Sequence, residues 1–192
     1  MNRKLLMIIA MFFVAMSSKA DQSRYEVKTA SGIFEVTLDF TQRRLVIRKN
    51  NIDYQIIYLE TALNAESKIV IRDFNLDGID DIGVTGDEGN VERFMNVYIY
   101  SKSNSKFELS KSLSAIPCLT VNVKNKNVSG ECFHVSSCEN WREVYSIKMR
   151  DSLRLIEKSG YYCDPSTNTS YRYIEKYRNG KLVKSSVAEV RQ

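Results

Sequence analysis

The chain has little of the residues on which common catalytic sites depend. Its 192 residues include one histidine, His134, and its four cysteines form no C-x-x-C pair. A lone histidine cannot build a multi-histidine metal site, and this cysteine spacing does not favour zinc. The sequence also lacks the P-loop, GxGxxG, GxSxG and HExxH motifs, which disfavours the enzyme classes that carry them. We therefore expect that this protein is not an enzyme.

Residues 1–20 have the composition of a secretory signal peptide. Two basic residues precede an apolar run at residues 5–16, and a small-residue cleavage site ends the segment. The apolar run is too short to span a bilayer. We expect cleavage before Asp21, export to the periplasm as a soluble protein, and no stable membrane anchor afterwards. Residues 21–192 are expected to form a single all-β domain.

The mature chain is nearly neutral. The full sequence carries a net charge of +5, but the signal segment holds three of the 28 Lys and Arg residues and none of the 23 Asp and Glu residues, which leaves +2. The mature sequence also has no run of three or more consecutive Lys and Arg residues. A near-neutral domain of this kind is a poor nucleic-acid binder, so we expect a protein partner and no nucleic-acid partner.

Apolar segments of strand length follow one another along nearly the whole mature chain. Asn179-Gly180, between two such segments, is the strongest hairpin signal. The only candidate for a turn of helix is at residues 61–67. With two prolines and no linker-like tract, we predict one all-β domain, an antiparallel meander of hairpins that is propeller-like, with a β-sandwich as the alternative. The predicted strands cover residues 33–40, 44–48, 54–59, 69–71, 82–84, 94–100, 106–109, 118–123, 128–135, 141–149, 153–158, 171–178 and 181–184.

The cysteines predict two disulfides, because an even number in an exported protein is typical of a disulfide framework. Two predicted hairpins have turns at residues 124–127 and 150–151. One pair of cysteines is equidistant from the first turn and the other pair from the second. Residues equidistant from a turn face each other across a hairpin, where the Cβ spacing suits a disulfide. The predicted pairs are Cys118–Cys132 and Cys138–Cys163.

One acidic segment, residues 73–81, has the spacing of a calcium-binding loop. Oxygen-bearing side chains occupy positions 1, 3, 5 and 9, and Gly78 at position 6 allows a tight turn. An EF-hand would need Glu at position 12, where this chain has Val84. We predict calcium, with a plain acidic turn as the alternative because Asp, Asn and Gly are common in turns. The predicted ligands are Asp73, Asn75, Asp77, the backbone carbonyl of Ile79, and Asp81.

The pattern DxNxDGxxD between two strands resembles the calcium loops of FG-GAP and integrin-like propeller repeats. The loop, then Val97-Tyr98-Ile99-Tyr100, then residues 106–109 and the Asn179-Gly180 hairpin, follow an order that resembles a family of exported bacterial proteins over about residues 68–185. One branch of that family is a periplasmic immunity protein against a lysozyme-like effector of a type IV secretion system. The resemblance implies a propeller-like fold, calcium in the loop, and occlusion of a hydrolase cleft. The four cysteines and the absence of a lipid anchor are departures, so the partner can differ.

A second resemblance concerns Ser159, Gly160, Tyr161 and Tyr162. They resemble the Ser-Gly-x-Tyr loop that periplasmic inhibitors of invertebrate-type lysozyme insert into their target. This implies a partner-binding loop, braced by the next residue, Cys163. The second motif of those inhibitors, a Thr-Lys-Gly after a tyrosine, is absent, and a plain turn beside a disulfide is the alternative. The polar segment at residues 85–93 is a second candidate loop.

Two functions stay open at this point. The first is a periplasmic calcium-binding immunity or inhibitor protein that binds and occludes a peptidoglycan hydrolase or a secreted effector. The second is a glycan-binding module or a metal-assisted hydrolase that uses the acidic loop. A stripe of Tyr171, Tyr173 and Tyr177 shares one strand face. We expect this stripe to pack in the core or across strands rather than at an interface.

Overall fold

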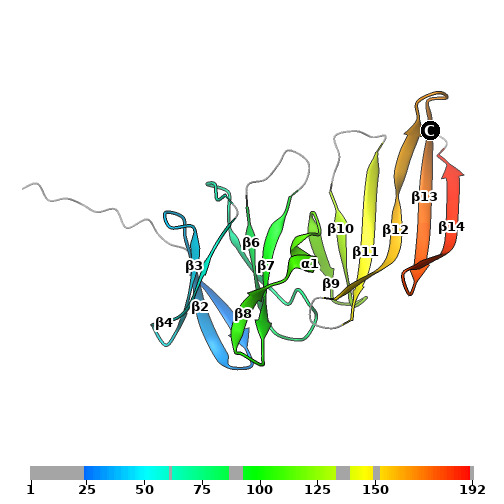
Figure 1. Ribbon diagram of the computed structural model, residues 1–192. Helices are drawn as coiled ribbons and strands as arrows, with labels where there is room; N and C mark the ends of the chain where they lie inside the picture. Colours follow the sequence, from blue (N-terminus) through cyan, green and yellow to red (C-terminus); the bar gives the residue numbers. More distant parts are fainter. Residues whose placement is uncertain (1–23, 61, 87–92, 133–138, 149–151, 191–192) are drawn as a thin grey trace, which may run out of the picture.

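The computed structural model describes residues 24–60, 62–86, 93–132, 139–148 and 152–190. Its strands form three antiparallel sheets that lie in a row in chain order (Figure 1). Within each sheet, every strand pairs with its neighbours in the sequence. The prediction of an all-β meander of hairpins is therefore confirmed.

The three sheets are named by their place in the chain. The N-terminal sheet consists of β1 (Arg24–Thr29), β2 (Gly32–Asp39), β3 (Arg44–Lys49) and β4 (Ile52–Tyr58). The central sheet consists of β5 (Ile69–Arg72), β6 (Asp81–Thr85), β7 (Met95–Ser101) and β8 (Lys106–Leu109). The C-terminal sheet consists of β9 (Leu119–Asn122), β10 (Asn127–Glu131), β11 (Asn140–Ile147), β12 (Leu153–Asp164), β13 (Thr169–Arg178) and β14 (Lys181–Glu189). A short helix, α1 (Lys111–Ser114), connects the last two sheets.

The first core lies between the N-terminal sheet and one face of the central sheet. Phe34 is its aromatic centre, with ring centroids 5.9 Å from Phe107 and 6.1 Å from Tyr100. Tilted and edge-on aromatic pairs at such distances add to the free energy gained from burial alone. The fully buried aliphatic members of this core are Val27, Val36, Leu45, Ile47 and Ile82.

The second core lies between the other face of the central sheet, α1 and the first strands of the C-terminal sheet. Phe74 and Val97 pack there against Leu113 of α1 and Val128 of β10. The helix begins after Ser110, whose Oγ accepts the N–H of Leu113 at 3.2 Å. This N-cap bond satisfies a backbone donor that has no partner inside the helix.

The helix expected at residues 61–67 is wrong for the described residues 62–67, which form turns and irregular backbone. Asn64 and Ser67 close this turn with two bonds. The N–H of Ser67 donates to the Asn64 carbonyl at 3.1 Å, and the N–H of Asn64 donates to Ser67 Oγ at 3.0 Å. Asn and Ser side chains compete in this way with helical hydrogen bonds.

The central sheet is buried on both faces. Along β7, Val97 and Ile99 belong to the second core, whereas Tyr98 and Tyr100 belong to the first. Successive strand residues point to opposite faces, so the continuous apolar run of β7 follows from burial on both sides. The stacked layers fit the β-sandwich alternative, and the described strands do not close into a barrel or a propeller ring.

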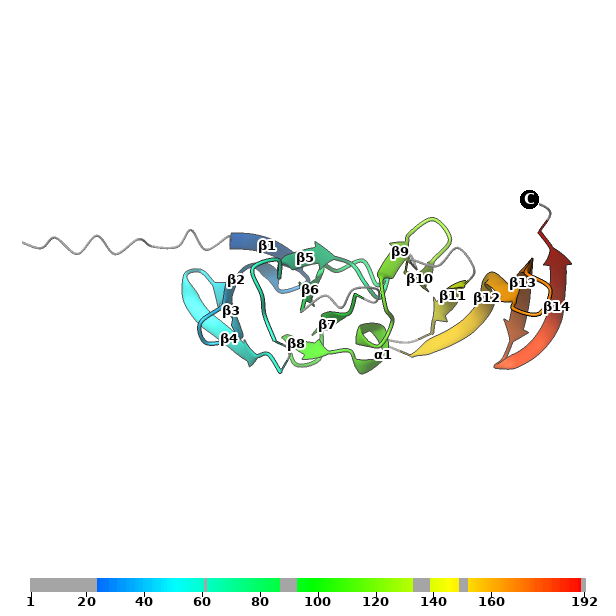
Figure 2. The same cartoon turned by 90° about the horizontal axis from the view of Figure 1, so that it is seen from above.

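The C-terminal sheet extends away from the two cores. Neither core includes a residue of β13 or β14, although both strands are fully described. All nine residues of β14 are exposed. Seen from above, β12, β13 and β14 lie at the end of the molecule farthest from the N-terminal sheet (Figure 2). We call this part, β12 to β14, the open end of the C-terminal sheet.

Candidate functional site

The acidic loop connects β5 to β6, and its side-chain oxygens turn back onto its own backbone. Asp73 accepts the N–H groups of Asp77 and Gly78 at 3.0 and 2.8 Å. Asn75 Oδ1 accepts the same Asp77 N–H at 3.1 Å, and Asp77 Oδ1 accepts the N–H of Ile79 at 2.9 Å. Gly78 has a φ of +84°, a conformation that glycine adopts without strain. The loop is thus folded around the predicted calcium ligands.

Asp81, the last predicted ligand, is fully buried at the start of β6. Its Oδ2 accepts the N–H of Phe74 at 3.0 Å, and its Oδ1 accepts the N–H of Tyr100 in β7 at 2.9 Å. The pKa of Asp81 is raised to about 7, mainly by burial and also by the nearby charges of Asp77 and Asp73, while the two N–H donors act in the opposite direction. Asp81 therefore fixes the loop to the neighbouring strand.

Asp80 adds a contact that the sequence reasoning missed. Its Oδ2 accepts the N–H of Lys28 in β1 at 3.2 Å, and its own N–H donates to the Lys28 carbonyl at 3.2 Å. This pair of bonds joins the loop to the N-terminal sheet, while Phe74 of the same loop packs in the second core. The loop is thus a junction between the sheets, and no local sequence signal distinguishes Asp80 from a surface acid.

The donor chemistry of the loop fits a hard cation, because carboxylate, amide and carbonyl oxygens are the ligands that calcium prefers. Asp73 and Asp77 lie close enough to Asp81 to raise its pKa. Within the described ranges, however, no three His, Cys, Asp or Glu side chains are grouped so that they could hold a metal ion. Calcium at Asp73, Asn75, Asp77, Ile79 and Asp81 therefore stays a prediction.

Ser159 to Tyr162 do not form a loop, which corrects the sequence-based expectation. They lie within β12 and pair with β11 on one side and β13 on the other. A Cβ at Gly160 would collide with the Asn140 carbonyl oxygen and lie 2.9 Å from the Tyr173 hydroxyl. Gly160 is explained by this close approach of neighbouring strands, and the sheet holds the segment rigid.

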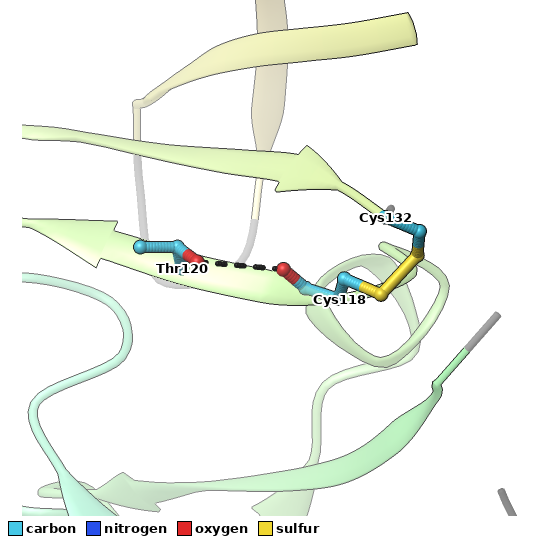
Figure 3. The surroundings of a disulfide bond; sticks show 3 residues. All are labelled: Cys118, Thr120 and Cys132. Atoms are coloured by element: carbon cyan, nitrogen blue, oxygen red, sulfur yellow. Dashed lines mark hydrogen bonds between the residues drawn. A yellow bond between two sulfur atoms is a disulfide. The ribbon is translucent and has the colours of Figure 1, made fainter. Parts of the chain in front are cut away.

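The first predicted disulfide is present in the structure, whereas the second involves a cysteine that lies outside the described residues. Cys118 and Cys132 are bonded, with their Cα atoms 5.4 Å apart, and the bond joins the start of β9 to the end of β10 (Figure 3). Cys163 is disulfide-bonded as well. Its predicted partner, Cys138, lies outside the described residues, so the pairing Cys138–Cys163 stays a prediction.

Several other expectations fall outside the described residues. They concern the signal peptide at residues 1–20, most of the candidate loop at residues 85–93, and His134. In the part of the chain that is described, no helix is long and apolar enough to cross a membrane.

The C-terminal sheet has an inner and an outer face. The inner face carries Val128 and Tyr145, which are paired and pack into the second core. Paired residues and alternate residues of an antiparallel sheet share a face. Gly160 and Tyr162 are therefore on the inner face, whereas Ser159 is on the outer face.

The inner face of the open end carries an aromatic cluster. Tyr162 of β12 pairs with Tyr171 of β13, and their rings stack with centroids 5.3 Å apart. Tyr173 lies 6.4 Å from Tyr162. Neither core includes these side chains, and Tyr162 is 40% exposed. The tyrosine stripe thus makes cross-strand contacts, as expected, but the expectation of core packing is wrong because no layer covers this part of the sheet.

The two faces carry opposite charge. On the outer face, strand pairing places the basic residues Arg142, Arg154, Arg172, Lys176, Arg178, Lys181 and Lys184, with the acidic residues Glu131 and Glu157. On the inner face it places one basic residue, Lys158, with Glu143, Asp164, Glu175 and Glu189. A sheet that alternates in this way presents a basic outer surface and an acidic, aromatic inner surface.

A separate cavity of about 420 Å³ opens beside β4 and the β7–β8 edge of the central sheet. Its walls include Tyr58, which is 70% exposed, Glu60 and the buried Tyr98. Burial, and then the charge of Glu60, raise the pKa of Tyr98 to about 12. Gln55 closes one side, because its amide group bonds both the N–H and the carbonyl of Phe107 at 2.9 Å. The cavity combines aromatic, amide and carboxylate groups.

The fold of this chain is similar to that of a solved structure. The chain is similar to a protein described as "Structure of a Xanthomonas Type IV Secretion System related protein", with a TM-score of 0.54 and 17% sequence identity. The match covers 90% of this chain and 95% of that chain. No protein-family model and no curated protein matches this chain. At this identity the likeness shows a shared fold over almost the whole length.

Proposed function

We propose that this protein is an exported, periplasmic inhibitor or immunity protein that binds a peptidoglycan hydrolase, or a secreted effector of that kind, and occludes its cleft. It acts through binding and is not an enzyme. The observation that carries the proposal is the open end of the C-terminal sheet. Its strands are held in register by pairing, yet among their residues only Leu153, at the start of β12, packs against a core, and their tyrosines stay partly exposed.

Rigid tyrosines favour this function physically. Tyr and Trp supply large contact areas with few rotatable bonds, and they are enriched among the residues that dominate binding energy. A preformed sheet loses little conformational entropy on binding. Ser159, Gly160, Tyr161 and Tyr162 lie in β12 and are the proposed partner-binding segment. Because they form a strand, Ser159 and Tyr161 lie on the outer face and Gly160 and Tyr162 on the inner face. We therefore assign the direct contact to a flat surface around Tyr161 and not to an inserted loop.

The structural neighbour gives independent support. That protein is described as related to a type IV secretion system, and such systems deliver proteins against which an immunity function is needed. A disulfide-bonded β fold is also consistent with an exported protein. The hydrolase or effector is inferred from the sequence resemblance described above.

The experiment that tests this function is lysis of peptidoglycan by lysozymes of several types, and by the hydrolase encoded beside this protein, with and without equimolar mature protein. We expect lysis by at least one of them to slow. Tyr161→Ala should weaken inhibition about tenfold, as for an interface hot spot. Tyr58→Ala removes another exposed tyrosine, on β4, and is the matched control. If no hydrolase is slowed, the proposal fails.

Calcium is the second part of the proposal, and the acidic loop is its site. A ligand that binds only the folded state stabilises it, by about 2.7 kcal/mol when its concentration is a hundred times Kd. Calcium added to metal-free protein should therefore raise Tm, and Asp77→Ala should abolish the rise. Asp53→Ala removes an exposed carboxylate from β4 and should leave the calcium-dependent rise in Tm unchanged. Identical melting curves of the wild type with calcium and with chelator would argue against the site.

The cavity beside β4 favours one alternative, a glycan-binding module. Aromatic faces stack on sugar rings, and Glu60 and the amide groups in the walls could bond hydroxyls. Under this alternative, soluble peptidoglycan fragments should bind, and Tyr58→Ala should weaken that binding while Tyr161→Ala does not. Binding of fragments without any inhibition of hydrolases would place this alternative ahead.

A further inference from the structure

The outer face of the open end has basic side chains that the protein itself leaves largely uncompensated. Arg142 is bridged by Glu131 at 3.1 Å and by Glu157 at 3.9 Å. Among the described residues, Arg172 and Lys176 form no ion pair and no side-chain hydrogen bond. Both acidic residues of the outer face thus pair with Arg142, so Arg172 and Lys176 have no acidic partner within the described part of the protein and can pair with a ligand.

Arg172 lines a cavity together with Ser159 and Tyr161, whereas Lys176 lines a second cavity of about 350 Å³. The cavity at Arg172 has a volume of about 280 Å³ and is lined by residues of β10 to β13. Strand pairing places Arg172 directly opposite Tyr161 and beside the pair of Ser159 and Ile174. A guanidinium, a phenol and a hydroxyl therefore converge on this cavity.

We infer that the basic outer face docks onto an acidic surface of a protein partner, with Arg172 paired to a carboxylate of that partner. The inference rests on the proposed function and names the surface and the chemistry of the partner. A guanidinium has five N–H donors in a planar arrangement that matches the two oxygens of a carboxylate. Ser159 and Tyr161 provide further donors beside it.

The size and composition of the cavity favour a protein partner over a small molecule. Pockets for small ligands usually have volumes of roughly 300–1,000 Å³ and enclose most of the ligand. A cavity of about 280 Å³ fits one side chain better. Arg, Tyr and Trp are the residues enriched in the hot spots of protein interfaces, and Arg172 and Tyr161 line this cavity.

The charges of the two faces also determine on which side of the sheet an acidic partner docks. The outer face is basic and the inner face is acidic, although the mature chain as a whole is near neutral. An acidic partner is therefore attracted to one side of the sheet and repelled from the other. Such complementarity mainly raises the association rate and excludes wrong orientations, and it weakens with salt.

The test compares two neutralising variants, Arg172→Gln on the outer face and Lys158→Gln on the inner face. Each removes one positive charge from the same strand region, so the change in net charge is matched. Lys158 forms an ion pair with Glu143 at 3.4 Å that is about one-third exposed and contributes little to stability. Melting curves and near-ultraviolet circular dichroism check that both variants fold.

The first readout is inhibition of whichever hydrolase the wild type slows. We expect Arg172→Gln to weaken inhibition about tenfold or more and Lys158→Gln to change it less than twofold. The affinity of the wild type should fall with salt more steeply than that of Arg172→Gln. Equal inhibition by wild type and Arg172→Gln would overturn the inference and leave the proposed function standing.

The second readout does not require a hydrolase. Mature protein is titrated with poly-glutamate, with poly-lysine, and with vesicles that contain anionic lipid. Binding of poly-glutamate that Arg172→Gln weakens and Lys158→Gln does not would support an acidic protein partner even if no hydrolase is inhibited. Binding of anionic vesicles without binding of poly-glutamate would overturn the inference in favour of a membrane surface. No binding of poly-glutamate and no inhibition would overturn both proposals.

Discussion

The central sheet and the open end of the C-terminal sheet are built from the same antiparallel pairing but are used in opposite ways. The central sheet is covered on both faces, and β7 contributes Val97 and Ile99 to one core and Tyr98 and Tyr100 to the other. In the open end only Leu153, at the start of β12, packs against a core, and β13 alternates aromatic with charged residues along much of its length. The comparison teaches that pairing holds the strands in both regions, whereas only the central sheet gains stability from burial.

The means of fixation differ as well. The Asp80 carboxylate ties the central sheet to the N-terminal sheet by accepting the N–H of Lys28 in β1, and the buried Asp81 carboxylate ties the acidic loop to β7 within the central sheet. The C-terminal sheet is fixed at its start by the Cys118–Cys132 disulfide. These stabilising contacts lie away from the open end, where we propose that a partner binds.

The largest expected effect comes from Asp81→Ala. The substitution leaves the buried N–H groups of Phe74 and Tyr100 without an acceptor, and each unsatisfied group costs about 1–3 kcal/mol. At the open end, Asp164 accepts the N–H of Ser166 in an exposed turn, where water can replace the carboxylate. Asp164→Ala should therefore lower the free energy of unfolding far less than Asp81→Ala does. Urea unfolding of both variants measures the difference, and equal losses would break the comparison.

The next effect concerns the disulfide that fixes the start of the C-terminal sheet. Replacing both Cys118 and Cys132 by Ala removes a crosslink that closes a loop with a sequence separation of 14. Such a loop contributes about 3 kcal/mol, mainly by restricting the unfolded chain. We expect the free energy of unfolding to fall by about this amount. A double variant as stable as the wild type would contradict the assignment of this role.

A matched pair of valines sharpens the comparison further. Val97→Ala removes methyl groups that are fully buried in the second core, whereas Val187→Ala removes methyl groups from a side chain that is 55% exposed on β14. Full burial of a Val side chain is worth about 1.5–3 kcal/mol. Val97→Ala should lower the free energy of unfolding by a large part of this amount, whereas Val187→Ala should lower it by less than about 0.5 kcal/mol. A large loss at Val187 would show that β14 is covered in solution, for example by a second copy.

The smallest effect is a change in one tyrosine pKa at the open end. The Tyr177 hydroxyl donates to Glu175 Oε2 at 2.6 Å, and this bond to the neutral phenol raises the pKa of Tyr177 above its ordinary value. Glu175→Gln removes the negative charge and should lower that pKa. Titration of the tyrosine ring signals by NMR measures the pKa of Tyr177, with Tyr100, whose pKa does not depend on Glu175, as an internal reference. An unchanged pKa would mean that the bond does not form in solution.

Much of the fold could be predicted from local sequence patterns. The strand segments, the Asn179-Gly180 hairpin and the pairing of Cys118 with Cys132 depend on interactions between residues close in the chain, so the period of side chains and the symmetry about a turn define them. The helix expected at 61–67 failed because Asn64 and Ser67 close a turn with their own side chains.

The site was harder to predict, because contacts between distant residues decide it. Ser159–Tyr162 resembled a loop, but pairing with β11 and β13 extends β12 through it. Asp80 was indistinguishable from its acidic neighbours until the fold brought it to Lys28, which lies 52 residues earlier in the chain.

The sequence by itself determined that this chain forms an antiparallel meander, because alternation, turn residues and cysteine spacing act over short distances. Alternation along β13 also places Arg172, Lys176 and Arg178 on one face, but irregular pairing in β12 and β14, which the tertiary structure decided, sets the faces of the other basic residues. Only the tertiary structure decided which faces are buried. The tyrosine stripe of β13 has the composition of a core strand, and it stays uncovered because the central sheet packs against the first strands of the C-terminal sheet and ends there.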